Sequence, residues 1–234
     1  MKVLIGGKGR MASLIRDLLV QRGHTVTGMA DALDLSELET FETADMVIDF
    51  SHRDNLGWII DYVRRNSCAL IYGTTGLSDE QKQQLFDLSR EYPVFYSANF
   101  SYGVAVLQEI LKKAVSLLKD TFDMELSETH HNKKADAPSG TAKALLEIMN
   151  ADHEYEEVYG RSGMCGARKK EIGVHSLRGG TEAGEHTVFF FGDQETITIT
   201  HHAADRKIFV NGAVRAAEFL EGKPAGMYTM QDLM

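Results

Sequence analysis

The chain has 234 residues, which is enough for one large domain or two smaller ones around a buried core. Its formal net charge of −9 argues against a nucleic-acid binder, because neutralising phosphates requires a basic face. No apolar run approaches the roughly 18 residues of a membrane span, and the apolar start is too short for a signal peptide, so we expect a cytoplasmic protein without membrane or nucleic-acid partners.

The first hundred residues alternate apolar runs with helical patterns, which is typical of a parallel α/β sheet. The pattern predicts helices at about 11–22, 54–66 and 79–91, and the third opens with a capping box at Ser78. The expected strands are Val3–Ile5, Thr25–Met29, Met46–Phe50, Ala69–Tyr72 and Val94–Tyr96.

After Lys119 the pattern changes to strands in which apolar and polar residues alternate. A long helix is expected just before this change, at about 103–119, and two further helices after it, at about 139–150 and 206–221. The segment 151–170 is polar. The expected strands are Phe122–Glu128, Ile172–Leu177, Thr187–Phe191 and Thr196–Thr200. This change of pattern predicts a second domain.

A glycine-rich loop joins the first expected strand to the first expected helix. Its residues, Gly7-Lys8-Gly9-Arg10-Met11-Ala12, match G-x-G-x-x-A, in which glycines allow a tight turn and close approach of a pyrophosphate to the helix N-terminus. The match alone is also compatible with a plain tight turn. Its place on the first strand, with Asp31 where an acidic ribose ligand belongs, favours dinucleotide binding.

Asp31 also bears on which dinucleotide is bound. Its carboxylate would repel the 2′-phosphate of NADPH and so favours NADH. Lys8 and Arg10 offer positive charge that would offset this repulsion, although Lys8 is explained equally well as a surface lysine. We therefore expect a protein that uses NADH or NADPH.

Two further loops follow strands at the same expected edge of the sheet. Gly73-Thr74-Thr75-Gly76 follows the fourth strand, and Ser97-Ala98-Asn99-Phe100 follows the fifth. Because open α/β sheets bind ligands at the carboxyl ends of their strands, we expect both loops to contact the cofactor. The alternative is an ordinary strand-to-helix loop in each case.

The segment 128–142, ETHHNKKADAPSGTA, gathers protonatable side chains beside an expected helix start, which in an acidic chain predicts a site for an anionic small molecule. His130 and His131 follow a strand, so their rings should point to opposite faces. A metal would need further ligands at the same point, and nothing in the sequence brings His201 and His202 there, so we expect no metal.

The helix start in this segment offers a place for a carboxylate. Pro138 suits a first helical turn, and the residues Ser139 to Thr141 would present unpaired N–H groups to the anion. Lys133 or Lys134 would add a charge-assisted hydrogen bond. The alternatives are a solvated lysine pair and a helix cap without a ligand.

Together these motifs resemble the bacterial dihydrodipicolinate reductase family, also called 4-hydroxy-tetrahydrodipicolinate reductases. The likeness runs nearly end to end and rests on E-x-HH-x-x-K-x-DAPSGTA, the glycine loop, Arg178-Gly179-Gly180, Gly184-Glu185-His186-Thr187, Asn211-Gly212-Ala213 and Gly226-Met227-Tyr228. Such enzymes use NADH or NADPH to reduce a cyclic dicarboxylate in lysine and diaminopimelate synthesis.

The resemblance implies an α/β fold with a Rossmann-type parallel sheet domain plus an α+β domain with a mixed, mostly antiparallel sheet. Residues 1–101 and 206–234 would form the dinucleotide-binding domain. Residues 102–205 would bind the substrate and assemble a homotetramer.

The resemblance also implies roles for single residues. His130 is similar to the family's proton donor/acceptor, Lys134 to its second proton donor, and His131, Gly140 and Thr141 to its substrate contacts. The implied cofactor contacts are Gly7, Lys8, Gly9, Arg10, Met11, Asp31, Gly73, Thr74, Thr75, Ser97, Ala98, Asn99 and Phe100. The sequence departs from the family pattern at Ala12, often glycine, and at Ala32, often arginine, which bears on 2′-phosphate recognition.

Two other functions are compatible with the same scaffold. A non-catalytic dinucleotide-binding sensor would keep the glycine loop but need not keep both candidate proton donors. Another NAD(P)-dependent reductase would need an anion pocket of a different shape.

Overall fold

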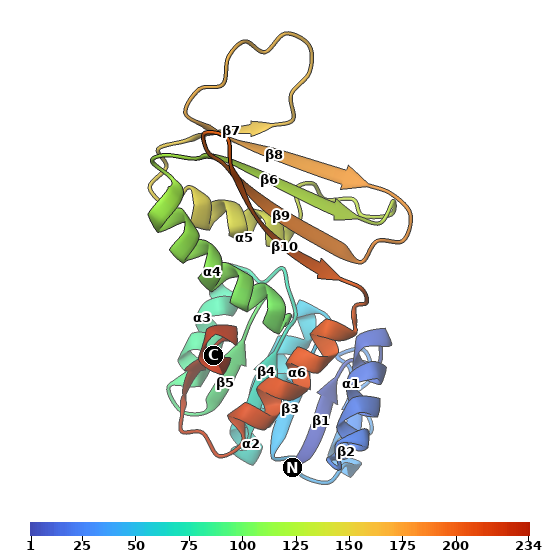
Figure 1. Cartoon of the computed structure of the whole chain (residues 1–234). Coiled ribbons are helices and arrows are strands. Elements are labelled where there is room, and N and C mark those ends of the chain that lie inside the picture. The colour runs from blue at the N-terminus through green and yellow to red at the C-terminus, as the bar shows by residue number, and fades with distance from the viewer. The chain divides into compact units, whose positions relative to one another are not determined.

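The computed structural model describes all 234 residues, which form two compact units (Figure 1). The first unit contains Met1–Tyr102 and Lys207–Met234, and the second contains Gly103–Arg206. The chain therefore leaves the first unit once and returns to it with its last helix. None of the helices combines the length and the apolar composition that a membrane-spanning segment needs.

The first unit is built on a sheet of parallel strands in the order β11-β5-β4-β3-β1-β2. The strands are β1 (Lys2–Gly6), β2 (Thr25–Ala30), β3 (Met46–Asp49), β4 (Ala69–Tyr72), β5 (Pro93–Tyr96) and β11 (Gly226–Tyr228). The parallel sheet expected from the sequence is confirmed, and β11 is an additional edge strand that the sequence did not indicate.

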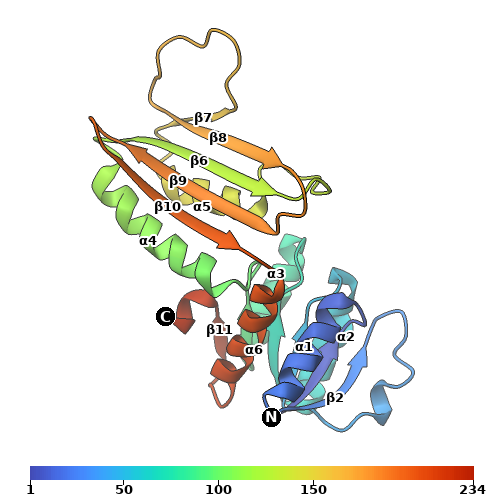
Figure 2. The ribbon, with the colours of Figure 1, turned by 45° about the vertical axis from the view of Figure 1, so that its right-hand side comes forward.

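Helices cover both faces of this sheet (Figures 1 and 2). They are α1 (Arg10–Gln21), α2 (Leu56–Asn66), α3 (Asp79–Ser89) and α6 (Lys207–Leu220), with short 3₁₀ turns at Leu38–Thr40, Arg53–Asn55 and Met230–Leu233. Leu4, Val47 and Leu70 pack with α2 and α3 in one buried cluster. Because strand side chains alternate, their neighbours Ile5, Ile48 and Ile71 face α1 and α6.

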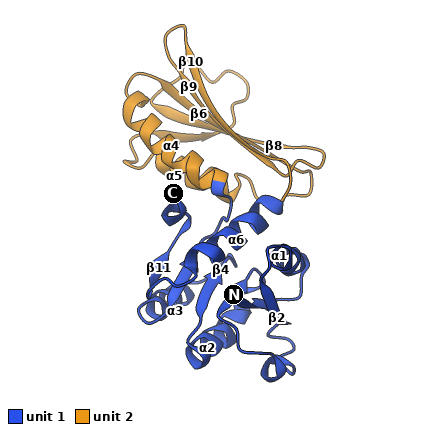
Figure 3. Ribbon diagram, turned by 60° about the horizontal axis from the view of Figure 1, so that its bottom comes forward, with its two compact units in different colours: residues 1–102, 207–234 blue, residues 103–206 orange.

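The second unit (orange in Figure 3) packs two helices on one mixed sheet. The helices are α4 (Tyr102–Leu118), whose first residue belongs to the first unit, and α5 (Gly140–Met149). The strands are β6 (Asp123–His130), β7 (Glu156–Tyr159), β8 (Glu171–Arg178), β9 (Gly184–Phe191) and β10 (Thr196–Ala203). Leu111, Leu126, Leu145, Val174 and Val188 share one buried core between sheet and helices.

The sheet of the second unit has the order β10-β9-β6-β8-β7. β10, β9 and β6 pair antiparallel, whereas β6, β8 and β7 pair parallel. The fold class is confirmed, but the expectation of a mostly antiparallel sheet missed this parallel half. The physical reason is the connection after β6. The chain crosses over through α5, and the unexpected strand β7 that follows therefore runs in the same direction as β6.

Candidate functional site

The glycine loop forms the tight turn expected between β1 and α1. Gly7 has φ +90°, and a Cβ at this position would lie 2.5 Å from Ser51 Cβ, so glycine is required twice over. Gly9 is the N-cap of α1, and no atom lies within 4 Å of where its Cβ would be. The loop therefore leaves space beside a helix N-terminus, which suits a phosphate.

A buried carboxyl ties this loop to its neighbours. Asp49 ends β3, and its carboxyl accepts hydrogen bonds from Ser51 Oγ and, at 2.5 Å, from Thr74 Oγ1. Burial raises the pKa of Asp49 to about 6, although these hydrogen bonds oppose the rise. A Cβ on Gly6 would collide with the same carboxyl. The sequence analysis missed Asp49, although a single acid inside the otherwise apolar run Met46–Phe50 is a visible signal.

The turn after β2 places a second carboxylate, that of Asp34, near Asp31. Asp31 forms an isolated bridge with Asp34, and Lys8 Nζ lies 3.4 Å from Asp34 Oδ2. The N–H of Ala32 donates to Asn55 Oδ1 at 2.5 Å. Lys8 therefore pairs with a second carboxylate near Asp31, and its charge is partly neutralised there.

The loops after β4 and β5 lie at the carboxyl ends of the parallel strands, on the same side of the sheet as the glycine loop. Gly73 has no room for a side chain, because its Cβ would lie 2.5 Å from Cζ of Phe50. Ser97 Oγ donates to the carbonyl of Asn99 at 2.7 Å, while Phe100 is buried against Phe50 and Phe95. Thr75 and Ala98 are exposed. The parallel topology thus brings the glycine loop, Asp31 and the loops after β4 and β5 to the carboxyl ends of the strands.

In the second unit, β6 ends in a buried network around Glu128. Glu128 Oε2 lies 2.5 Å from His130 Nδ1, and Oε1 accepts from the N–H of Ser139 at 3.2 Å. Arg178 donates to both oxygens, at 2.9 and 2.7 Å. Burial alone would raise the pKa of Glu128, but hydrogen bonds from Arg178, Ser176 and His130 lower it to about 2.

His130 is the last residue of β6 and packs against a second histidine. Its ring centroid lies 5.2 Å from that of His186, whose Nε2 is 2.9 Å from Ser139 Oγ. Burial lowers the pKa of His186 to about 4, so this ring is neutral at physiological pH. Burial also lowers the pKa of His130, and Glu128 opposes that effect.

The neighbouring side chains include the second predicted proton donor, Lys134, and one predicted substrate contact, His131. Lys134 Nζ pairs with Asp136 Oδ1 at 2.9 Å and is mostly buried, whereas Lys133 is exposed. His131 has a different partner from His130, because its Nε2 accepts from Arg206 Nη2 at 3.1 Å. No group of three or more histidine, cysteine, aspartate or glutamate side chains is arranged to hold a metal ion.

The start of α5 lies beside this network. Ser139 is the N-cap, and its Oγ accepts from the N–H of Ala142 at 3.1 Å. Pro138 precedes the cap, so the expectation that it lies in the first turn is wrong, because the Ser139 side chain takes the capping position. Gly140 is exposed, with no atom within 4 Å of its Cβ position, and a ligand has room to approach it.

The sequence motifs contain Glu128, Arg178 and His186, but sequence reasoning gave none of them a role in this site. Glu128 carried a signal, because residues two apart on a strand face the same side, and it stands two before His130. Arg178 and His186 enter through strand register: Arg178 lies opposite His130, and His186 lies opposite Glu128.

Comparison with known proteins identifies relatives over the whole chain. The family model for the N-terminus of dihydrodipicolinate reductase matches residues 1–100, and the model for its C-terminus matches residues 103–234. A 4-hydroxy-tetrahydrodipicolinate reductase of Brachyspira hyodysenteriae is 41% identical, with all of both chains covered. The protein of that name from Staphylococcus aureus is 42% identical, again over both entire chains.

A solved structure supports the fold. The dipicolinate-bound dihydrodipicolinate reductase of Paenisporosarcina sp. TG-14 superposes with a TM-score of 0.81 at 21% identity, covering 100% of this chain and 99% of that one.

Proposed function

The chain belongs to the dihydrodipicolinate reductase family, and from this premise we propose that it reduces 4-hydroxy-tetrahydrodipicolinate. Loss of water from the hydroxyl-bearing carbon and its neighbour gives a dehydrated ring, and hydride from NADH or NADPH then adds to that ring. The product would enter lysine and diaminopimelate biosynthesis. The observation that carries the proposal is the joint presence, in one buried network, of His130 and the capped start of α5.

The first unit has the features that a dinucleotide requires. We assign the pyrophosphate to the loop Gly7–Met11 and the adenosine ribose to Asp31. The segments Gly73–Thr75 and Ser97–Phe100 would line the nicotinamide end. The open space at Gly9 supports this assignment, as does the hydrogen bond that fixes Thr74 on Asp49. When bound, the dinucleotide supplies the hydride.

The second unit would hold the dicarboxylate. The first-turn N–H groups at Gly140 and Thr141 suit one carboxylate, because helix N-termini attract anions. His131 and Lys134 would contact the ligand from the loop after β6. The carbon next to the reduced one needs a proton, and His130 would deliver it from Nε2, with Lys134 as second donor or as stabiliser of developing negative charge.

An absorbance assay tests this function directly. Freshly generated 4-hydroxy-tetrahydrodipicolinate should cause loss of the reduced-nicotinamide band in the presence of the protein. Dipicolinate, a planar dicarboxylate, should inhibit competitively with the substrate. Absence of turnover with both NADH and NADPH, using protein that still binds dipicolinate, would contradict the proposal and favour a sensor.

The same assay addresses the choice of cofactor. Asp31 and its neighbour Asp34 place two carboxylates near the expected ribose position, and Lys8 is partly neutralised by Asp34. We therefore expect the KM for NADH to be equal to or lower than that for NADPH. A preference for NADPH above about a hundredfold, or about 2.7 kcal/mol, would overturn this interpretation of Asp31.

We also propose a homotetramer assembled through the second unit, located in the cytoplasm. The sheet face opposite α4 and α5 exposes Leu177 and Phe191, and the rings of Phe189 and Phe191 stack 5.6 Å apart. Exposed apolar side chains and an open edge strand favour burial against another copy. Light scattering coupled to size-exclusion chromatography should give about four times the 26.0 kDa chain mass.

A further inference from the structure

Glu128 connects the two parts of the candidate site in the second unit, which are His130 and the start of α5. Its side chain is completely buried. One carboxylate oxygen faces His130, and the other accepts from the backbone N–H of Ser139, the N-cap of α5. Arg178 donates to both oxygens. We propose that Glu128 is a positioning residue that fixes the tautomer and proton affinity of His130. The proposal rests on the proposed function, in which His130 exchanges the proton.

The tautomer follows from the hydrogen bonds. An ionised carboxylate is an acceptor only, and Arg178 keeps Glu128 ionised, so Nδ1 of His130 must carry the hydrogen of their shared bond. The lone pair of the neutral ring then lies on Nε2, for which the protein provides no hydrogen-bond partner. A Cβ at Gly184 would lie 3.0 Å from Nε2, so glycine there leaves this nitrogen uncovered.

The charged and titratable groups around His130 come from several elements. Glu128 lies on the same strand, Arg178 on β8, His186 on β9, and Lys134 in the loop after β6. Burial, Lys134 and Arg178 lower the pKa of His130, and only Glu128 raises it. Without the carboxylate, the ring would hold its proton more weakly at any pH near neutrality.

The same carboxylate sets the position of the ring relative to the anion site. Ser139 is held at two points, by its N–H on Glu128 and by its Oγ near His186 Nε2. His130 is held by the other oxygen of Glu128. His130 and the N-cap residue Ser139 are therefore both held by the buried carboxylate of Glu128, which Arg178 binds through both oxygens.

Nitrogen-15 NMR of histidine-labelled full-length protein tests the inference without turnover. In the unmodified protein, neutral His130 should show the Nδ1–H tautomer. In Glu128→Gln its pKa should fall, whereas the matched control Glu125→Gln, on the opposite face of β6, should leave it unchanged. A neutral ring protonated on Nε2 in the unmodified protein would overturn the proposal, even if Glu128→Gln fails to fold.

Kinetics provide a second readout that a purely structural role would not produce. At pH 8 we expect kcat of Glu128→Gln to fall on the order of 100-fold, the lower end of general acid–base catalysis. Lowering the pH should restore part of the loss, because it reprotonates His130. KM should change less, since glutamine still accepts from the N–H of Ser139. A loss independent of pH would contradict the inference.

The two proposals fail in different ways. If the unmodified protein lacks reductase activity, the proposed function is wrong, but the NMR titration still decides whether Glu128 controls His130. If the protein is active and the titration of His130 is the same in Glu128→Gln, only the positioning role is wrong.

Discussion

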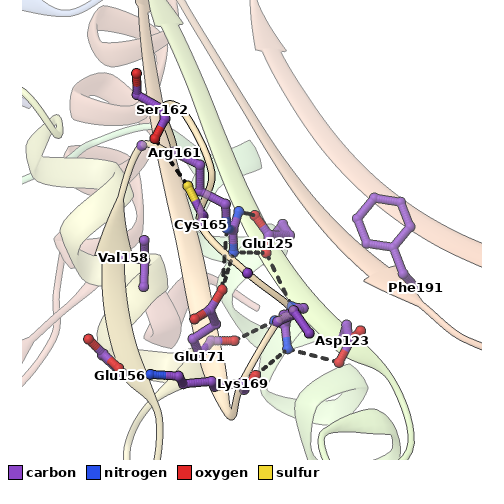
Figure 4. Close-up of a pocket in the computed structure, with 14 residues that line it drawn as sticks. Asp123, Glu125, Glu156, Val158, Arg161, Ser162, Cys165, Lys169, Glu171 and Phe191 are labelled. Carbon is purple, nitrogen blue, oxygen red and sulfur yellow. Dashed lines mark hydrogen bonds and ion pairs between the residues drawn. The ribbon is translucent and has the colours of Figure 1, made fainter.

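Strand β6 carries two clusters of the same composition on its two faces. On one face, Glu128 accepts from Arg178 and meets His130. On the other, Glu125 accepts from Arg161 at 2.8 Å through both oxygens and lies 3.0 Å from His175 Nε2 (Figure 4 shows Glu125 and Arg161). Hydrogen bonds from arginine and histidine overcome burial and lower the pKa of each carboxyl to about 2.

The surroundings of the two clusters differ. The Glu125 side chain is 14% exposed and His175 is 37% exposed, whereas Glu128 is fully buried and His130 is 11% exposed. Arg161 also binds Glu171, and Arg168 also approaches Glu125, so this cluster is a network of fully paired charges. The Glu128 cluster instead adjoins a helix N-terminus and leaves Nε2 of His130 without a partner. The same three residue types thus form a structural ion-pair network on one face of β6 and the proposed reactive site on the other, according to what lies next to them.

Replacing the histidines should separate the clusters most strongly. His130→Gln should lower kcat by about 10²- to 10⁴-fold, because the proton donor is lost, and Lys134→Ala should also reduce turnover severely. His175→Gln should leave kcat within a few-fold of the original. Steady-state assays check this, with fluorescence titration of NADH to show that the cofactor still binds. Near-normal turnover in both His130→Gln and Lys134→Ala would refute the assignment of the proton donors.

Replacing the arginines should separate the clusters by stability. Arg178→Leu leaves a completely buried carboxylate without its main partner and should cost about 3–5 kcal/mol. Arg161→Leu should cost less, because Glu125 is partly exposed and keeps His175 and Arg168 as neighbours. Urea denaturation followed by circular dichroism measures both. Equal losses would mean that burial does not distinguish the two carboxylates.

Only part of this contrast was readable from the sequence. Apart from β11, the strands and helices of the first unit follow from apolar periodicity, and so does the alternation that makes β6 two-faced. Glu128 and His130 share a face by simple strand geometry. Arg178 and His186 reach them only through the register of strands far along the chain, and no local pattern encodes that register.

Short polar strands were missed for a related reason. Residues Glu156–Tyr159 form β7 but are mostly exposed, so they show no apolar face. Their strand exists because β8 offers a parallel edge to pair with. Backbone pairing of this kind leaves no trace in hydrophobic periodicity, although it adds a second parallel pairing to the one between β6 and β8.

Acid stability should be the property in which the clusters differ least. Both carboxyls have a folded-state pKa of about 2, below the ordinary value of 4.5. Between these values the unfolded chain binds more protons, so each group stabilises the fold above pH 4.5 and loses that contribution as the pH falls towards 2. Glu128→Gln and Glu125→Gln should therefore each flatten the acid limb of unfolding free energy against pH, by similar amounts. If only Glu128→Gln flattened it, the ion pairs around Glu125 would be too solvated to matter, and the clusters would differ in energetics as well as chemistry.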